Sequence, residues 1–228
     1  MFGTCDGAFA EFVRTPQDRL APIPQNLTFE QAAALPTSGT TALMALRDAG
    51  KVRPGQQVLV IGAGGGVGTF AVQLAKAFGA EVTGVCSTSK VELVRSIGAD
   101  HVVDYTVEDF TDGELRYDLI VDTAGNRSLS HLRRALTPRG TFVIVGGEEG
   151  GRWLAGMDRQ LRMVLLGPFT RRWPLVVFAF PKPELVETLA EQGKITPVVD
   201  KTFPLSEVSE AVRELARGHA RGKLVITV

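Results

Sequence analysis

A run of glycines between a predicted strand and a predicted helix constrains this chain more than any other feature. QQVLVIG (56–62) is a short apolar run typical of a buried strand, and AGGGVG (63–68) follows it directly. From Val67 to Phe78 apolar residues recur at helical spacing, and Gly79 ends the predicted helix. Glycines let a backbone approach a pyrophosphate, and a helix N-terminus presents N–H groups to it. The sequence predicts a dinucleotide-binding turn; the alternative is a tight turn without a ligand.

The spacing of these glycines departs from the common G-x-G-x-x-G pattern. Counted back from Gly68, that pattern falls on Ala63, Gly65 and Gly68, so an alanine stands where the first glycine is usual. Gly62 offers a second frame, G-x-x-G-x-x-G, in which the first glycine is retained. The sequence leaves both frames open.

Short apolar strands and helical patterns alternate along the middle of the chain. Helices are expected over 91–97 and from Ser128 to Leu136, and the second is followed by a predicted turn at TPRG (137–140). This alternation predicts a parallel sheet covered by helices on both faces, the doubly wound architecture of nucleotide-binding proteins. The strands that follow the first are expected at EVTGVC (81–86), HVVDY (101–105), YDLIVDTAG (117–125) and TFVIVGG (141–147).

The two flanks of this region carry weaker signals. Residues 1–36 contain one strand-like piece, GAFAEFVRTP (7–16), and then an extended, proline-punctuated stretch through APIPQNLTFEQAAALP (21–36). Residues 148–182 show no clear period apart from two apolar runs. The last part of the chain predicts a helix from Glu184 to Gln192, the stretch ITPVVDKTFPL, a helix after Ser206 and a final strand KLVITV.

The position after the second predicted strand lacks the acid that a dinucleotide site commonly has. Such an acid binds the ribose hydroxyls of NAD and repels a 2′-phosphate, whereas this chain carries Ser87, Thr88 and Lys90 there. Hydroxyls can donate hydrogen bonds to a phosphate and lysine supplies a positive charge, so the sequence favours NADPH over NADH. The alternative for Lys90 is a solvated lysine in the first turn of a helix. The missing acid also argues against a methyltransferase.

The composition excludes several classes of partner. Lys plus Arg and Asp plus Glu both total 25 among 228 residues, so no global field attracts nucleic acid or an anionic membrane. No apolar run approaches the ~20 residues of a membrane span, and MFGTCDGAFAEF is not expected to be a signal peptide. Cys5 and Cys86 are too few and too far apart for a disulfide framework or a metal knuckle. We therefore expect a cytoplasmic enzyme or binding protein.

Several stretches together resemble the zinc-independent quinone oxidoreductase and enoyl reductase branch of the medium-chain dehydrogenase/reductases. The resemblance covers essentially the whole chain. It implies an α/β fold with a doubly wound parallel sheet, the Rossmann domain, at 37–182. Residues 1–36 and the C-terminal segment 183–228 would form a partial GroES-like substrate lobe. The stretches that carry the resemblance are GAFAEFVRTP, LTFEQAAALPTSGTTALMAL, VRPGQQVLVIGAGGGVG, GADHVVDY and GHARGKLVITV.

The resemblance also implies roles for single residues. Thr41 would lie beside the nicotinamide, the backbone from Gly65 to Gly68 would hold the pyrophosphate, and Lys90 with Tyr105 would bind the 2′-phosphate of NADPH. The alternative for Tyr105 is an aromatic side chain packed on the adenine side, and the glycines after the fifth strand could serve only to permit a turn. The full set of expected cofactor-binding residues is Thr41, Gly65, Gly66, Val67, Gly68, Ser87, Thr88, Lys90, Tyr105, Asn126, Gly146 and Gly147.

Neither a metal nor a catalytic side chain is expected. In zinc-dependent relatives a cysteine before the first strand of the cofactor domain helps to bind the metal, and Thr37 occupies that position here. A hydroxyl is a poor zinc ligand beside thiolate and imidazole. Asp118 and Asp122 lie on the fourth predicted strand, where a carboxylate is interpreted as structural rather than as a base.

The activity that the resemblance implies is hydride transfer from NADPH to a quinone, an enone or a related carbonyl compound, without zinc. The protein would supply orientation and a dry pocket for this small-molecule substrate. The alternative is an NADPH-binding module or redox sensor with little or no turnover. Most of the family's substrate lobe would precede GAFAEF, so we expect either a truncated chain or another chain that covers the exposed edge. Apolar runs at 163–180 suggest a homodimer, with ordinary core strands as the alternative.

Overall fold

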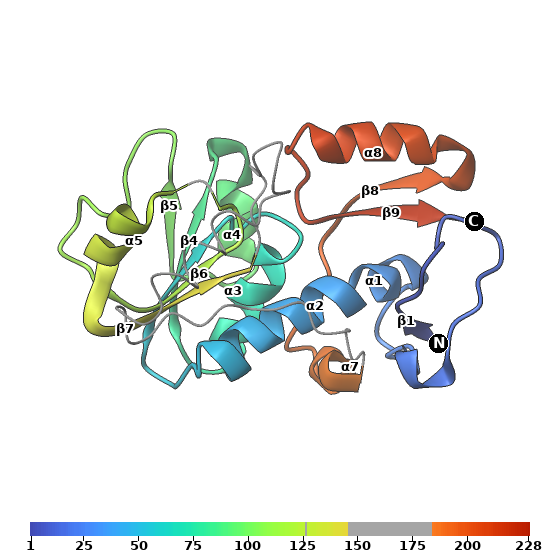
Figure 1. The fold of residues 1–228 in the computed structure, drawn as a ribbon, viewed down its shortest axis with the longest axis horizontal. Coiled ribbons are helices and arrows are strands. Elements are labelled where there is room, and N and C mark those ends of the chain that lie inside the picture. The colour runs from blue at the N-terminus through green and yellow to red at the C-terminus, as the bar shows by residue number, and fades with distance from the viewer. Residues whose placement is uncertain (126, 146–183) are drawn as a thin grey trace.

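Five parallel strands form the central sheet of the structure, a computed structural model that describes residues 1–125, 127–145 and 184–228 (Figure 1). The chain moves outwards from β3 to β5 on one side of the sheet and then crosses to β6 and β7 on the other. This order confirms the predicted doubly wound α/β fold, and it creates a switch point at the carboxyl ends of β3 and β6, where such folds bind ligands. In spatial order the strands are β5 (His101–Asp104), β4 (Glu81–Cys86), β3 (Gln57–Ile61), β6 (Tyr117–Asp122) and β7 (Leu136–Ile144).

Both faces of this sheet are buried, which explains why its strands read as continuous apolar runs. Val58 and Val60 of β3 point into one core, and Leu59 and Ile61 point into the other. The first core is covered by α3 and α4 and the second by α5, because the alternation of side chains along each strand sends neighbours to opposite faces. The covering helices are α3 (Gly68–Ala77), α4 (Val91–Ser96), which follows a 3₁₀ turn at Thr88–Lys90, and α5 (Leu129–Ala135).

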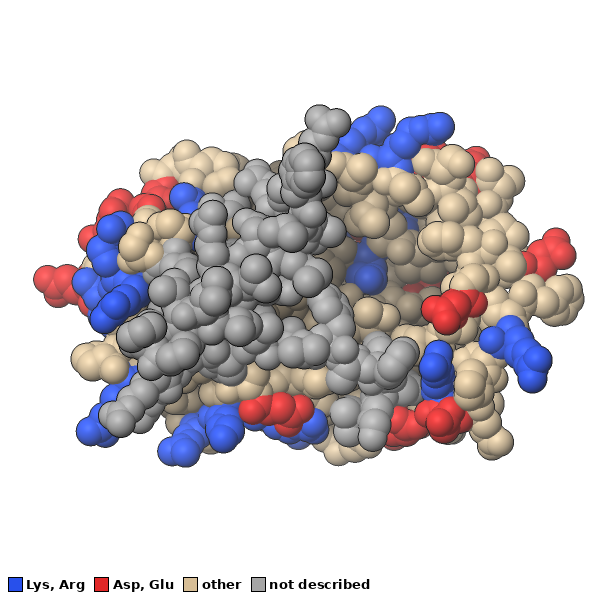
Figure 2. Space-filling view, viewed as in Figure 1, with Lys and Arg blue, Asp and Glu red and all other residues tan. Residues whose placement is uncertain are grey.

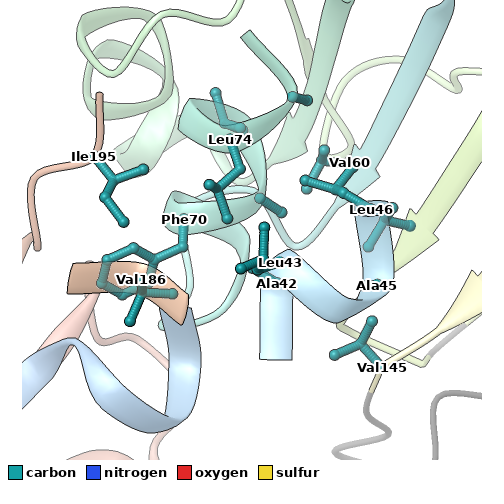
Figure 3. Close-up of a cluster of buried hydrophobic side chains, with 14 of the residues drawn as sticks. Ala42, Leu43, Ala45, Leu46, Val60, Phe70, Leu74, Val145, Val186 and Ile195 are labelled. Carbon is teal, nitrogen blue, oxygen red and sulfur yellow. The ribbon is translucent and has the colours of Figure 1, made fainter. Parts of the chain in front are cut away.

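The larger core extends from the sheet to the helices α2 and α7. α2 spans Pro36–Leu43 and continues as a π-helical segment, Met44–Ala49, while α7 spans Glu184–Glu191. Figure 3 shows Leu43, Phe70 and Val186 gathered where α2, α3 and α7 meet, and each of these side chains is at most 1% exposed. The C-terminal segment is therefore anchored on the sheet domain through an apolar contact.

A small β-α-β unit follows α7. β8 (Val199–Pro204) pairs in parallel with β9 (Lys223–Thr227), and a 3₁₀ turn (Leu205–Glu207) with α8 (Val208–Ala216) connects them. This unit lies at the opposite end of the molecule from β5 and α5, and α1 packs against both of its strands (Figure 1). The predicted helix and final strand of this region are confirmed.

The N-terminal segment differs from its prediction in two places. GAFAEFVRTP (7–16) is not a strand: within the described residues it pairs with no other strand, and Phe12 is 90% exposed. Instead β1 (Phe2–Gly3) pairs with β2 (Leu20–Ala21), which follows a 3₁₀ turn at Gln17–Arg19. The stretch expected to be extended contains α1 (Phe29–Ala34), because Thr28 and Gln31 form a capping box in which each side chain accepts a hydrogen bond from the other's backbone N–H.

The predicted turn at TPRG (137–140) is a bulge at the start of β7. Tyr117 pairs with Leu136 but Leu119 pairs with Thr141, so β7 contains additional residues between these two pairs. A Cβ on Gly140 would lie 2.8 Å from the Tyr117 carbonyl oxygen, and this close approach needs a glycine. The apolar runs at 163–180 lie outside the described residues, and the division into 1–36, 37–182 and 183–228 stays a prediction. No helix of the described part is long and apolar enough to span a membrane.

Candidate functional site

A cleft of about 630 Å³ opens at the switch point of the sheet. One wall comes from the loops that follow β3, β4, β5 and β6, and the other from the loop between α8 and β9. The volume is in the range of small-molecule and cofactor sites. The residues that line it are Ser38, Gly62, Gly64, Gly65, Gly66, Val67, Cys86, Ser87, Thr88, Ser89, Lys90, Tyr105, Thr106, Thr123, Ala124, Gly218, His219 and Lys223.

The glycine turn forms the centre of this cleft, and its geometry decides between the two frames. Gly62 adopts a φ of 81°, a left-handed conformation that favours glycine, whereas Ala63 is fully buried. A Cβ on Gly68 would lie 2.0 Å from the Gly62 carbonyl oxygen, so only glycine fits at the start of α3. The frame that the backbone uses is therefore G-x-x-G-x-x-G, beginning at Gly62.

Lys223 brings a positive charge to this turn from the far end of the chain. Its Nζ donates a hydrogen bond to Ser38 Oγ at 3.1 Å, and a Cβ on Gly66 would lie 3.7 Å from the same Nζ. Gly222 N donates to Gly64 O at 3.0 Å, which docks the start of β9 on the turn. Burial lowers the pKa of the Lys223 ammonium, so an anion that accepted a hydrogen bond from it would relieve its desolvation.

The other end of the cleft collects the residues expected to discriminate between cofactors. Ser87, Thr88, Lys90 and Tyr105 all line it, and Tyr105 is 47% exposed. Lys90 Nζ donates a hydrogen bond to Ala220 O at 2.6 Å, so its stem crosses the cleft towards the loop before β9. These side chains lie together as predicted, and their role in binding a 2′-phosphate stays a prediction.

Cys86 also lines this end of the cleft. Burial, together with the nearby Asp104 charge, raises the pKa of the Cys86 thiol to about 11. The thiol is therefore protonated at neutral pH and is a poor nucleophile.

Some expected residues do not line the cleft. The Thr41 hydroxyl donates to the Thr37 carbonyl at 2.7 Å, within its own helix, and Gly68 supports the turn from behind. Asn126, Gly146 and Gly147 lie outside the described residues, so their predicted roles are untested.

Several lining residues were not predicted from the sequence. Ser38 lies in α2, and Thr106, Thr123 and His219 lie in loops after β5, β6 and α8. For Lys223 a signal exists in the sequence, because a lysine opens the largely apolar final strand KLVITV. Nothing in that pattern shows that the strand begins beside the glycine turn, because the two stretches are far apart in the chain.

The two carboxylates of β6 have structural roles, as predicted. Asp122 is fully buried, and its Oδ1 accepts hydrogen bonds from the N–H groups of Ala124 and Gly125 at 3.1 and 2.9 Å. Asp118 accepts a hydrogen bond from Gln57 N at 3.1 Å. Both groups hold loops and strands in place, so neither is positioned as a base.

Known proteins with similar sequences identify the family. The profile of the family described as zinc-binding dehydrogenase matches residues 97–226, more than half of the chain. The chain belongs to the zinc-binding dehydrogenase family. A relative from Mus musculus, "NAD(P)H oxidoreductase RTN4IP1, mitochondrial", is 37% identical over 244 residues, which cover 97% of this chain and 61% of the relative.

Two further matches extend this family assignment. The "Chloroplast envelope quinone oxidoreductase homolog" of Arabidopsis thaliana is 32% identical over 232 residues, covering 96% of this chain and 68% of the relative. A solved structure titled "Crystal Structure of NAD-dependent alcohol dehydrogenase" matches with a TM-score of 0.81 at 32% identity, covering 97% of this chain and 65% of that one. The chain thus spans about three-fifths to two-thirds of the lengths of these proteins. The predicted resemblance to the quinone oxidoreductase branch of the medium-chain dehydrogenase/reductases is confirmed.

The family's description includes zinc, but the described residues of this chain do not fit a zinc ion. Among them no group of three or more His, Cys, Asp or Glu side chains could hold a metal ion. Thr37, which the resemblance places at the position of a zinc-binding cysteine, offers only a hydroxyl on the first turn of α2.

Proposed function

We propose that this chain is the cofactor-binding part of an NADPH-dependent oxidoreductase that transfers a hydride to a quinone, an enone or a related carbonyl compound without zinc. The observation that carries the proposal is the cleft, which joins a glycine turn, a partly buried ammonium and a hydroxyl-rich end. The names of the relatives, which include an NAD(P)H oxidoreductase and a quinone oxidoreductase homolog, support the same reaction class.

The residues present fit a nicotinamide dinucleotide along the length of the cleft. The glycine turn and the N-terminus of α3 would hold the pyrophosphate through backbone N–H groups, with Lys223 adding a charge-assisted hydrogen bond. Ser87, Lys90 and Tyr105 would surround the adenosine end. When bound, the cofactor supplies the hydride at its nicotinamide ring. The chain's own contribution is to orient the ligand and to exclude water, and no side chain of the described residues is assigned as a proton donor.

Binding and turnover separate the enzyme from its alternative. An oxidoreductase binds NADPH saturably and oxidises it when a quinone or an enone is added, whereas a binding module or redox sensor shows the binding without acceptor-dependent oxidation. We expect NADPH fluorescence titration to give saturable binding to the purified chain. Failure to bind either NADPH or NADH would overturn both candidates.

Zinc independence, a homodimer and a cytoplasmic location are parts of the same proposal. Dialysis against a chelator should leave NADPH oxidation unchanged, and a loss that added zinc restores would contradict zinc independence. Light scattering on the purified chain tests the homodimer, and fluorescence microscopy of the tagged protein tests the location. Figure 2 shows basic and acidic side chains interspersed over the described part of one face, which supports the expectation of no nucleic-acid partner.

A further inference from the structure

A chain of two hydroxyls and one carboxylate closes the adenosine end of the cleft. Thr106 Oγ1 donates a hydrogen bond to Asp104 Oδ1 at 2.7 Å, and Thr106 N donates to the same oxygen at 3.0 Å. Thr88 Oγ1 lies 2.9 Å from Thr106 Oγ1. Thr88 and Thr106 both line the cleft, so the chain runs from a carboxylate behind the wall to a hydroxyl on its surface.

The number of protons in this series of hydrogen bonds limits which groups can act as donors. A hydroxyl carries one proton, and an ionised carboxylate only accepts. Hydrogen bonds from the hydroxyl of Thr88 and then from Thr106 lower the pKa of Asp104, so this group is ionised at neutral pH. The one proton of the Thr88 hydroxyl is directed to the carboxylate side, either to Asp104 or to Thr106 Oγ1, whose own proton goes to Asp104. Thr88 therefore turns lone pairs, rather than a proton, towards the cleft.

Asp104 occupies the place of the acid that the sequence lacks after β4. Asp104 ends β5 and pairs across the sheet with Cys86, the last residue of β4. An acid at the end of the second strand selects an unmodified ribose. In this protein the carboxylate lies at the end of the neighbouring strand β5, and the hydroxyls of Thr106 and Thr88 connect it to the cleft. The ribose 2′-hydroxyl of NADH can donate to Thr88, whereas a 2′-phosphate brings negative charge and only acceptor oxygens.

We propose that Asp104, acting through Thr106 and Thr88, is a positioning residue for cofactor specificity, and that it favours the unmodified ribose against the preference of Lys90 for a 2′-phosphate. The inference rests on the proposed binding of a nicotinamide cofactor. It revises the role of one predicted residue: Thr88 is an acceptor for a ribose hydroxyl and not a donor to a phosphate. In this arrangement Asp104 favours NADH and Lys90 favours NADPH. The preference of the site for NADPH is therefore smaller than it would be with Lys90 alone.

A second loop of the chain supplies the matched control. Thr111 N and Thr111 Oγ1 both donate to Asp109 Oδ1 at 2.8 Å, in the same local geometry as Thr106 and Asp104. Neither Asp109 nor Thr111 lines the cleft. Thr111→Val therefore also removes a threonine hydroxyl from a hydrogen-bonded turn, and it should reproduce any purely structural effect of such a change. It should not change the specificity for the cofactor.

The test compares two probes that differ only in the 2′-phosphate, adenosine 5′-monophosphate and adenosine 2′,5′-bisphosphate, by isothermal titration calorimetry. Thr88→Val should weaken the monophosphate by about 3- to 10-fold, the loss of one neutral hydrogen bond, and the bisphosphate by less than about twofold. Asp104→Asn should tighten the bisphosphate several-fold, more strongly at low salt, and leave the monophosphate unchanged or weaker. Thr111→Val should change neither affinity.

The outcomes separate this inference from the proposed function. If the unaltered chain binds neither probe nor NADPH, the proposed function fails. If it binds both probes and Thr88→Val weakens the bisphosphate more than the monophosphate, Thr88 is a phosphate donor and the inference is wrong. Unchanged ratios of the two affinities in both Thr88→Val and Asp104→Asn would also overturn it. Thr88 is exposed, so Thr88→Val is expected to keep the fold, and a thermal melt checks this.

Discussion

Replacing Lys223 by methionine should weaken cofactor binding strongly while leaving the protein without cofactor at least as stable. The Lys223 ammonium is partly buried, donates a hydrogen bond to the hydroxyl of Ser38 at 3.1 Å, and lies beside the glycine turn. At an effective dielectric constant of about 20, two unit charges 4 Å apart interact by about 4 kcal/mol, which is an upper bound for the contact with a phosphate. A charge-assisted hydrogen bond contributes about 1.5 to 3 kcal/mol net.

These magnitudes predict that Lys223→Met raises the Kd for NADPH by about 10- to 150-fold. NADH should be weakened equally, because both cofactors carry the pyrophosphate. The protein without cofactor should not be destabilised, because methionine fills the space of the lysine stem and removes a desolvated charge. Calorimetric titration gives the Kd values, and urea unfolding without cofactor gives the stability.

The matched control is Lys201→Met on the neighbouring strand β8. The Lys201 side chain is 51% exposed and forms an ion pair with Glu214 on the surface of the same unit. This variant removes the same charge from the same β-α-β unit and should leave the Kd for NADPH within about twofold, since exposed ion pairs contribute little. A Kd for Lys223→Met that stays within threefold of the unaltered chain, or that matches the control, would refute the assignment of Lys223 to the pyrophosphate.

Three further substitutions test other parts of the structure. Lys90→Ala should raise the Kd for NADPH by about 10- to 100-fold and that for NADH by less than about threefold in fluorescence titrations, and equal effects would contradict its role at the 2′-phosphate. Phe70→Ala empties the core at a fully buried position and should cost about 3 to 5 kcal/mol in urea unfolding, whereas Phe12→Ala, at a 90% exposed position, should cost less than about 0.5 kcal/mol; similar costs would refute the packing. Burial raises the pKa of Asp100, but hydrogen bonds from Lys76 and from the backbone N–H of Val82 lower it overall, so its stabilisation is present above its ordinary pKa of 3.8 and is lost as pH falls through the lower folded pKa. Asp100→Asn should therefore lower the free energy of unfolding by about 1 kcal/mol at pH 7 and by less at pH 3, and a loss of the same size at both values would contradict this.

The sheet domain could be predicted from the sequence because its signals are local. Each strand of the sheet is an apolar run bounded by turns, and buried parallel strands need no alternation to be recognised. The sequence shows the glycine turn by its place between a strand and a helix, whereas the positive φ of Gly62 in the structure decides which frame the backbone uses. Its conformation depends on hydrogen bonds from Gly62 N and Ala63 N to Val85 O, which a linear pattern does not show.

The remaining features depend on contacts between distant segments or on weak local signals. Thr28 and Gln31 have the spacing of a capping box, but the prolines around them favour extended chain, so the sequence does not predict α1. The strand expected at 7–16 has no pairing partner within the described residues. The contacts of Lys223 with Ser38 and of Thr88 with Thr106 could not be predicted, because each joins separate segments of the chain.

The seam between the sheet domain and the C-terminal β-α-β unit has a kinetic consequence for any ligand of the cleft. Lys90 with Ala220, Gly222 with Gly64, and Lys223 with Ser38 are polar contacts across this seam, and most of these residues also form the wall of the cleft. A ligand that touches both sides would act as a removable cross-link, and it could leave only when the seam opens. Its residence time would then measure how often the two units separate, and substitutions in the seam away from the ligand would alter the dissociation rate more than the association rate.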